Sequence, residues 1–239
     1  MTRDGIVFRL LGRVASGATL RRWLRPSRLY LASHRVRPLS TFYGLERGTP
    51  IDRYFIERFL HANREVIRGW CLEIKDSAYT RRFGGERVSR SDVLDIDPSM
   101  PEANIHGDLR RLDGIESDRY DCIILTQVLQ FIDACESALR ECHRILKPGG
   151  VLLASVPSVG RIDPRPGVDR DYWRFTAAGA RYLFHKVFDA SYVEVKAHGN
   201  CRVGLGFWVG MAVEELTEAA RELNDPDFPV LVTIRAIKR

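Results

Sequence analysis

The chain has 239 residues, enough for one α/β domain with a full core or for one domain with an additional arm. Hydrophobic residues make up 45% and charged residues 28% of it, fractions that are ordinary for a soluble globular protein. There is no apolar run of membrane-spanning length, no signal-peptide pattern, no CxxC pair and no Cys/His ligand spacing. We therefore expect a cytoplasmic protein with reduced cysteines and no metal site.

The positive charge is concentrated in an N-terminal arm, 1–47. Residues 1–38 contain nine arginines and one acid, a charge of +8, which leaves −2 of the total of +6 for the rest of the chain. Apolar residues recur at helical spacing from Ile6 to Ala18, and a second short helix is expected within 20–30. The arm is either a solvated amphipathic helix packed on the domain or a surface for anionic lipid, a glycosyltransferase partner or phosphorylated substrate.

Nucleic acid is not expected as a partner of the arm. No aromatic platform alternates with the arginines, and the remaining domain, 48–239, is not basic. If the arm binds lipid, the protein would be peripheral at the inner membrane surface.

The sequence pattern predicts alternating helices and strands in the domain 48–239. Its first helix opens at 48–51, where Pro50 suits a first turn, and ends before Asn63. Strands are expected at 70–74, 91–97, 105–109, 122–125 and 151–156, and later strands at 192–197 and 228–236. Helices are expected at 129–146 and 177–188, and 204–223 is expected to be mostly helical after a glycine-rich entry.

The predicted fold is built around the segment from Tyr120 to Val156. An apolar strand is followed by a helix, and Lys147-Pro148-Gly149-Gly150 stops that helix with a cation, a proline and a left-handed glycine cap before the next apolar strand. Two buried strands joined by one helix form a right-handed βαβ unit and predict a parallel sheet.

This segment resembles the fourth and fifth strands of class I S-adenosylmethionine (SAM)-dependent methyltransferases of type 11. The resemblance rests on Tyr120-Asp121, on Val128-Leu129 and on the run Arg144-Ile145-Leu146 before Lys-Pro-Gly-Gly. The resemblance implies a Rossmann-like fold with a mostly parallel central sheet, helices on both faces and an antiparallel C-terminal strand. It also implies that SAM binds across the carboxyl ends of the strands.

In this family, a glycine-rich loop after the first strand lets the backbone approach SAM. Glu73 matches the acid that opens the family's motif, but Lys75, Ser77 and Tyr79 stand where its three glycines belong. A Cβ in a left-handed conformation costs about 1 kcal/mol or more, so Lys75 is strained if the loop keeps the family's path and tolerable if it takes another.

The resemblance assigns further cofactor contacts at the next strand ends. Asp95 aligns with the acid that holds the ribose hydroxyls, and Asp97 is its competitor. Asp108 aligns with the adenine reader, together with a neighbouring backbone N–H at Leu109, and Gln127 borders the methionine moiety. Each Asp could instead be an ordinary turn or capping residue.

The acceptor site is expected near the polar loop 157–176. The string Asp171-Tyr172-Trp173-Arg174, with Gly48-Thr49-Pro50-Ile51 near the start, resembles a methyltransferase subgroup associated with glycan assembly. Aromatic faces and an arginine suit a sugar, so Tyr172, Trp173, Arg174 and Gln130 are the candidate acceptor contacts. Alternatively, the tryptophan anchors the loop in the core.

The expected function is SAM-dependent O-methylation of a sugar hydroxyl on a cell-surface glycan or glycolipid. The candidate general bases are His198, which follows a strand, and Asp171 in the aromatic cluster. The alternative is a binding or scaffold protein that kept the fold and lost the cofactor. An NAD-dependent sugar oxidoreductase is disfavoured because G-x-G-x-x-G is absent.

Overall fold

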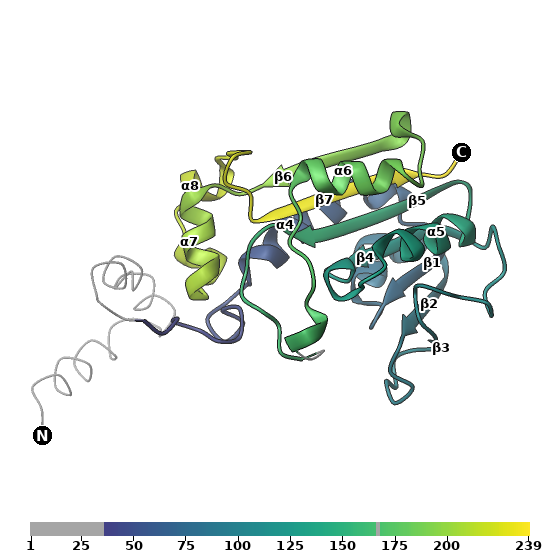
Figure 1. The fold of residues 1–239 in the computed structure, drawn as a ribbon, viewed down its shortest axis with the longest axis horizontal. Coiled ribbons are helices and arrows are strands. Elements are labelled where there is room, and N and C mark those ends of the chain that lie inside the picture. The colour runs from purple at the N-terminus through teal and green to yellow at the C-terminus, as the bar shows by residue number, and fades with distance from the viewer. Residues whose placement is uncertain (1–35, 166–167) are drawn as a thin grey trace, which may run out of the picture.

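The computed structural model describes residues 36–165 and 168–239, which form a seven-stranded sheet with the strand order β3-β2-β1-β4-β5-β7-β6 (Figure 1). The strands are β1 Gly69–Ile74, β2 Val88–Asp95, β3 Ile105–His106, β4 Tyr120–Thr126, β5 Leu146–Pro157, β6 Val193–His198 and β7 Leu231–Ile237. The pairs from β3 to β5 are parallel, and β7 is antiparallel to both β5 and β6. The predicted mostly parallel sheet with an antiparallel C-terminal strand is confirmed.

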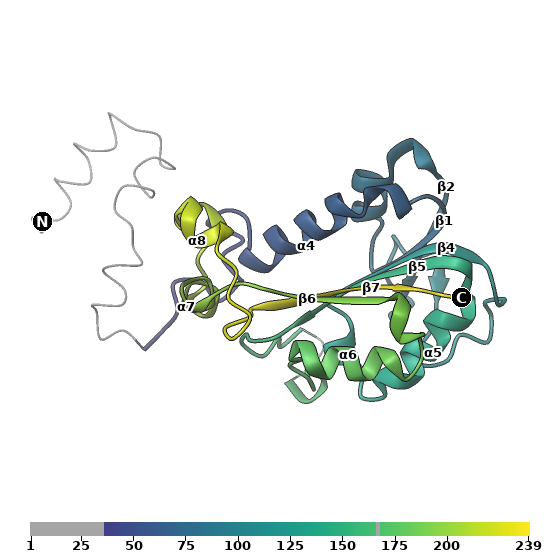
Figure 2. The same ribbon diagram turned by 90° about the horizontal axis from the view of Figure 1, so that it is seen from above.

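Helices cover both faces of the sheet (Figure 2). One face carries α4, Ile51–Ala62, and the other carries α5, Cys135–Ile145, and α6, Ala177–His185. Two more helices, α7 (Cys201–Val209) and α8 (Glu218–Glu222), lie together beyond the ends of β6 and β7 (Figure 1). Each face has its own apolar core, one containing Leu139 of α5 and Phe184 of α6, the other Phe55 of α4 and Phe207 of α7.

The central βαβ unit forms as predicted, but its helix is shorter at both ends. A separate 3₁₀ turn at Leu129–Phe131 precedes α5, and Leu146 is already extended after the last helical residue, Ile145. Gly149 has the expected left-handed conformation, with φ +82°, but it does not cap the helix. Its N–H donates to the carbonyl of Lys238, so this glycine lies within the first part of β5 and bonds to the residue that follows β7.

The stretch 204–223 is mostly helical, as expected, but it is divided into the end of α7, a 3₁₀ turn at Val213–Glu215 and the short α8. Asn200 caps α7 by accepting the N–H of Val203, and Gly210, at φ +74°, ends it. Thr217 then caps the short α8 by accepting the N–H of Ala220. Thr176 caps α6, where its Oγ1 accepts the N–H of Gly179 at 3.0 Å.

The described end of the basic arm is attached to α7. The Leu39 N–H donates to the Val209 carbonyl at 2.8 Å, and Pro50 forms a β-bridge with Ala212. The two helices predicted within residues 1–35 lie outside the described residues. Within the described ranges, the structure contains no helix with the length and apolarity needed to cross a membrane.

A candidate cofactor and acceptor cleft

A cleft of about 680 Å³ lies at the carboxyl ends of the parallel strands. Its floor comes from the ends of β1, β2, β4 and β5, and its walls come from residues 42–56 and from the loop after β5. The predicted site residues that line it are Glu73, Lys75, Asp95, Asp97, Asp108, Leu109, Gln127, Gln130, Asp171 and Arg174. Parallel strands bring their carboxyl ends to one edge, which is why residues far apart in the sequence meet here.

The loop after β1 keeps a glycine-like path although it has no glycine there. Lys75 has φ +78°, and its N–H donates to the carbonyl of Leu94 on β2 at 2.9 Å. Its side chain is exposed and lines the cleft. The strained alternative considered for Lys75 is therefore the one that the structure adopts, and the ammonium becomes part of the cleft wall.

Glu73 holds this loop from within. Its carboxylate is almost fully buried and accepts the N–H of Thr80 at 2.7 Å and that of Tyr79 at 3.2 Å. Burial raises the pKa of Glu73 to about 7, and the two backbone donors oppose that rise only in part. Both carboxylate oxygens are therefore used to start the following helical turn.

Ser77 does not reach the cleft. It is buried, and its Oγ accepts a hydrogen bond from Arg81 at 2.8 Å. Tyr79, the third residue at a family glycine position, does line the cleft.

At the end of β2, Asp95 and Asp97 each leave Oδ2 without a hydrogen bond in the described part of the chain, but Asp97 is exposed and Asp95 is not. Asp97 uses one oxygen, Oδ1, to accept both the N–H and the hydroxyl of Ser99, bonds that lower its pKa and fix its own turn. Asp95 accepts the N–H of Asp97 with Oδ1, and its Oδ2 has no hydrogen bond within the described part of the chain. Asp95 is half-buried and is therefore the better placed of the two for ribose hydroxyls.

Asp108 and Leu109 follow β3 and line the cleft next to the end of β2. The guanidinium of Arg110 bonds both oxygens of Asp108, and these bonds lower the pKa of that carboxyl. A carboxylate offers about four acceptor positions, so a further donor can still be accommodated. The backbone N–H of the adjacent Leu109 has no partner among the described residues.

Two glutamines border the end of β4. Gln127 has φ +56°, and its Oε1 accepts a hydrogen bond from Gln130 Nε2 at 3.0 Å. Gln130 is almost completely buried, and its own Oε1 has no partner in the part of the chain that the structure describes. A buried acceptor without a partner is costly, so this amide favours a ligand donor in the cleft.

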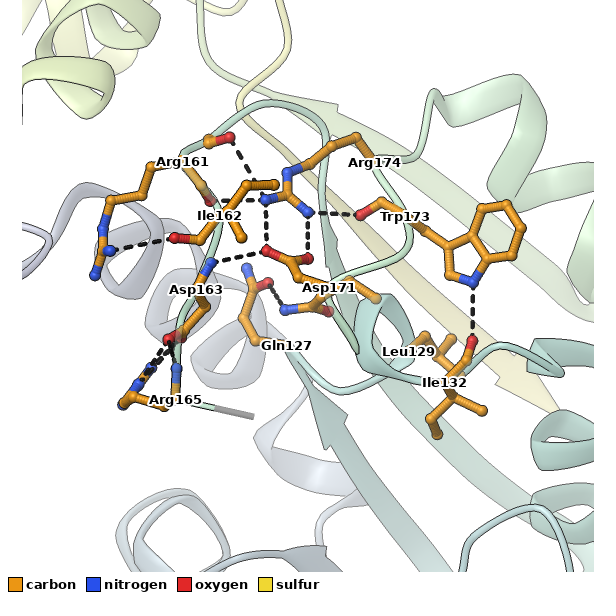
Figure 3. A network of polar contacts seen from close by, with 12 residues as sticks. Gln127, Leu129, Ile132, Arg161, Ile162, Asp163, Arg165, Asp171, Trp173 and Arg174 are labelled. Carbon is orange, nitrogen blue, oxygen red and sulfur yellow. Dashed lines mark hydrogen bonds and ion pairs between the residues drawn. The ribbon is translucent and has the colours of Figure 1, made fainter. Parts of the chain in front are cut away.

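The loop after β5 is fastened by an ion pair (Figure 3). Arg174 donates to both oxygens of Asp171 at 2.6 and 2.8 Å and also to the carbonyl of Arg161. Burial alone would raise the pKa of Asp171, but the bonds from Arg174 and from the Asp163 N–H lower it below its ordinary value. Asp171 is therefore a poor proton acceptor, and Arg174 is used to hold the loop.

Tyr172 and Trp173 lie outside the cleft. Both side chains are more than two-fifths exposed, and Figure 3 shows the Trp173 ring directed away from Asp171. The indole N–H donates to the carbonyl of Ile132 at 2.8 Å. The structure therefore supports neither predicted position of the Trp173 ring, the acceptor cleft or the core.

His198 also lies outside the cleft, at the end of β6. One ring nitrogen is 2.7 Å from Thr233 Oγ1, and the ring packs against Phe55. Burial lowers the pKa of His198 to about 4. This placement argues against His198 as the general base.

Asp52 is a candidate that sequence reasoning missed. It lies in the first turn of α4 and lines the cleft, and the hydrogen bond to its carboxylate within the described residues comes from the N–H of Arg53. Burial raises the pKa of Asp52, which makes this carboxylate a better base than the paired Asp171. The sequence showed Asp52 only as a charge that suits a helix N-terminus, because the residues that partly cover it in the cleft come from distant segments.

The fold is the Rossmann-like architecture of class I SAM-dependent methyltransferases, with a cleft at its usual ligand edge. Residues 76–154 match the methyltransferase domain family. The chain is 30% identical over 153 residues to a probable SAM-dependent methyltransferase from Mycolicibacterium smegmatis. That match covers 60% of the chain, which spans 57% of the length of this curated relative.

Solved structures share the fold at low sequence identity. A SAM-dependent methyltransferase from Archaeoglobus fulgidus has a TM-score of 0.53 and 14% identity over 78% of this chain and 94% of its own. A SAM-dependent methyltransferase from Mesorhizobium loti has a TM-score of 0.51 and 15% identity, over 79% of this chain and 98% of its own. A [4+2]-cyclase has a TM-score of 0.51 and 14% identity, over 92% of this chain and 95% of its own. This fold therefore also occurs in a protein named for different chemistry.

We expect Lys75→Gly to stabilise the protein by about 1 kcal/mol, because glycine adopts φ +78° without a Cβ clash. Urea denaturation of the two proteins measures the difference. Lys75→Ala is the matched control, since it removes the charge but keeps the Cβ and should leave the stability nearly unchanged. Equal stabilisation by both substitutions would show that charge, not backbone strain, is responsible.

Glu73 makes stability depend on pH near neutrality. Its pKa rises from 4.5 to about 7 on folding, so the folded state binds the extra proton and this group's contribution falls as pH rises from about 4.5 to 7. Relative to Glu73→Gln, we expect the wild type to lose on the order of 3 kcal/mol across that window. Denaturation at several pH values measures this, with the exposed Glu116→Gln as control. A pH-independent difference would contradict the prediction.

Proposed function

We propose that the chain is a SAM-dependent methyltransferase that methylates a hydroxyl group, with a sugar of a cell-surface glycan or glycolipid as the acceptor. The observation that carries the proposal is the set of unused polar groups around one cleft: Asp95 Oδ2, the Leu109 N–H and Gln130 Oε1. These three groups lie at or just after the ends of β2, β3 and β4. Their hydrogen-bonding capacity suits a nucleoside that carries a polar tail. The family match and the named relative support the same cofactor.

The residues of the cleft suit each part of SAM. Asp95 would accept the ribose hydroxyls, and Asp108 with the Leu109 N–H would bind the adenine edge. Lys75 and Gln130 would face the charged methionine end, because they line the cleft at the ends of β1 and β4. Bound SAM supplies an electrophilic methyl group, so orientation of the acceptor is the main task left to the protein.

The acceptor side of the cleft has both polar and apolar walls. Tyr43, Phe131 and Phe207 line it together with the carboxylates of Asp52 and Asp163. Apolar ring faces and hydrogen-bonding groups are the combination that a sugar needs. Asp52 would accept the proton of the acceptor hydroxyl at this wall, and the electrophilic methyl group would come from SAM bound in the same cleft.

The alternative is a scaffold protein that keeps the fold without the cofactor. The locked pair of Asp171 and Arg174 favours it, because this ion pair leaves neither side chain free to act in catalysis. A measurement of SAM binding distinguishes the methyltransferase from the scaffold.

Calorimetric titration with SAM and with S-adenosylhomocysteine tests the cofactor. We expect binding in the micromolar range, weakened about tenfold or more by Asp95→Ala and by Asp108→Ala, since each loses hydrogen bonds to a charged acceptor. Asp97→Ala is the matched control and should bind nearly as the wild type does. No binding at millimolar cofactor would favour the scaffold.

Replacing the proposed base separates chemistry from binding. Asp52→Asn should lower kcat by about 10² to 10⁴ with an unchanged Kd for SAM, because a base contributes that factor to hydroxyl transfer. The wild-type rate should rise with pH through the raised pKa of Asp52, and the variant should lack that rise. His198→Gln is the control. A larger loss in the His198 variant would contradict the assignment.

A further inference from the structure

Lys75 places an unpaired cation in the cleft. Its exposed side chain lines the cleft just after β1, and its ammonium makes no hydrogen bond or ion pair with any residue that the structure describes. Arg165 and Arg174 line the same cleft, but each is paired with a buried carboxylate. The charge of Lys75 therefore remains for a ligand, whereas the charges of these two arginines are neutralised within the protein.

The backbone of Lys75 is already committed to the protein. Its N–H donates to the carbonyl of Leu94 at 2.9 Å, so what this residue offers a ligand in the cleft is its ammonium. Its φ of +78° disfavours any residue with a Cβ. Backbone outliers of this kind gather at ligand sites, where the strained residue has a use. The position therefore calls for a ligand group that needs a cation.

An unsatisfied acceptor lies at the adjoining strand end. β1 and β4 are hydrogen-bonded neighbours with Glu73 in register with Ile124, so the residues that follow the two strands lie close to each other. Gln130, after β4, is buried and lines the cleft, and its Nε2 donates to Gln127. Its Oε1 has no partner in the described ranges. A donor from a ligand would remove the cost of this buried oxygen.

These two groups are complementary to an amino-acid tail. An unpaired cation suits a carboxylate, a buried acceptor suits an ammonium, and an α-amino acid carries both on one carbon atom. A phosphate group would match Lys75 but would bring no N–H donor for Gln130. A sugar hydroxyl would match Gln130 but would bring no charge for Lys75.

We infer that Lys75 is a specificity-determining residue that binds the α-carboxylate of the cofactor, while Gln130 Oε1 accepts a hydrogen bond from its α-ammonium. The inference rests on the proposed function, because it needs a cofactor that ends in an amino acid. A hydrogen bond to a charged group changes affinity about tenfold to a hundredfold. Lys75 therefore makes the cleft select adenosine derivatives with a complete tail over those without the carboxylate.

Calorimetric titration with S-adenosylhomocysteine and with its decarboxylated analogue, which lacks only the carboxylate, tests the role of Lys75. We expect the wild type to bind S-adenosylhomocysteine about tenfold or more tightly than the analogue. Lys75→Met keeps the Cβ and the length but removes the charge, so it should bind both ligands about equally. Lys75→Arg should keep the preference. Lys196→Met changes an exposed lysine on β6 outside the cleft and should behave as the wild type does.

The ratio of the two dissociation constants separates recognition from folding. A partly unfolded variant loses affinity for both ligands by the same factor, so its ratio does not change. Gln130→Leu removes the acceptor for the ammonium, which both ligands carry, and should weaken both alike while keeping the preference. Undiminished affinity in this variant would contradict the role of Gln130.

The titration also distinguishes this inference from the proposed function on which it rests. If S-adenosylhomocysteine binds but Lys75→Met keeps the wild-type ratio, the role of Lys75 is overturned and the proposed function stands. If neither ligand binds the wild type, both are overturned. A preference that Lys75→Met abolishes and Lys75→Arg retains is the expected result.

Discussion

One buried carboxylate determines the shape of the cleft. Glu73 ends β1 inside the protein and accepts the two backbone N–H groups that begin the next helical turn. Because the loop has no glycine at the family positions, these bonds define where the turn starts and place Tyr79 in the cleft wall. Burial opposes the charge that makes the bonds strong, so the carboxylate is stable only while both donors remain in place.

The backbone after Glu73's strand, β1, and after its neighbour β4 shows the same constraint. Lys75 after β1 and Gln127 after β4 both have positive φ, although neither is glycine. Such conformations cost about 1 kcal/mol or more each and persist only where the surroundings impose them. Here they occur at two adjacent strand ends that face the cleft, so part of the backbone strain lies at the ligand edge of the sheet.

Much of the fold could be predicted from the sequence because its signals are local. Apolar runs indicated the strands, and the Lys-Pro-Gly-Gly run located the start of β5. The parallel order then predicted that Asp95, Asp108 and Gln127 would converge. Element ends were less accurate: the sequence pattern did not reveal the break at Gly210, because the apolar residues on both sides of it continue the helical spacing.

The roles of individual site residues could not be predicted in the same way, since they depend on partners. Asp171 pairs with Arg174, and His198 faces Thr233 from the neighbouring strand. Neither pairing has a spacing rule that assigns it. Asp52 becomes a candidate base only when residues from distant segments bury it, and the direction of the Trp173 ring depends on the carbonyl of Ile132.

The strained loop bears on the choice between an enzyme and a scaffold. A scaffold that no longer binds a ligand gains stability by relaxing Lys75, whereas the structure keeps it in the path that a glycine would take. It also keeps Gln130 buried with an acceptor that has no partner among the described residues, a cost that a donor bound in the cleft would remove. Both features lie in the same cleft as the unused oxygen of Asp95. Their common location favours a site that still binds a ligand with hydroxyl and amine donors over one that has lost it.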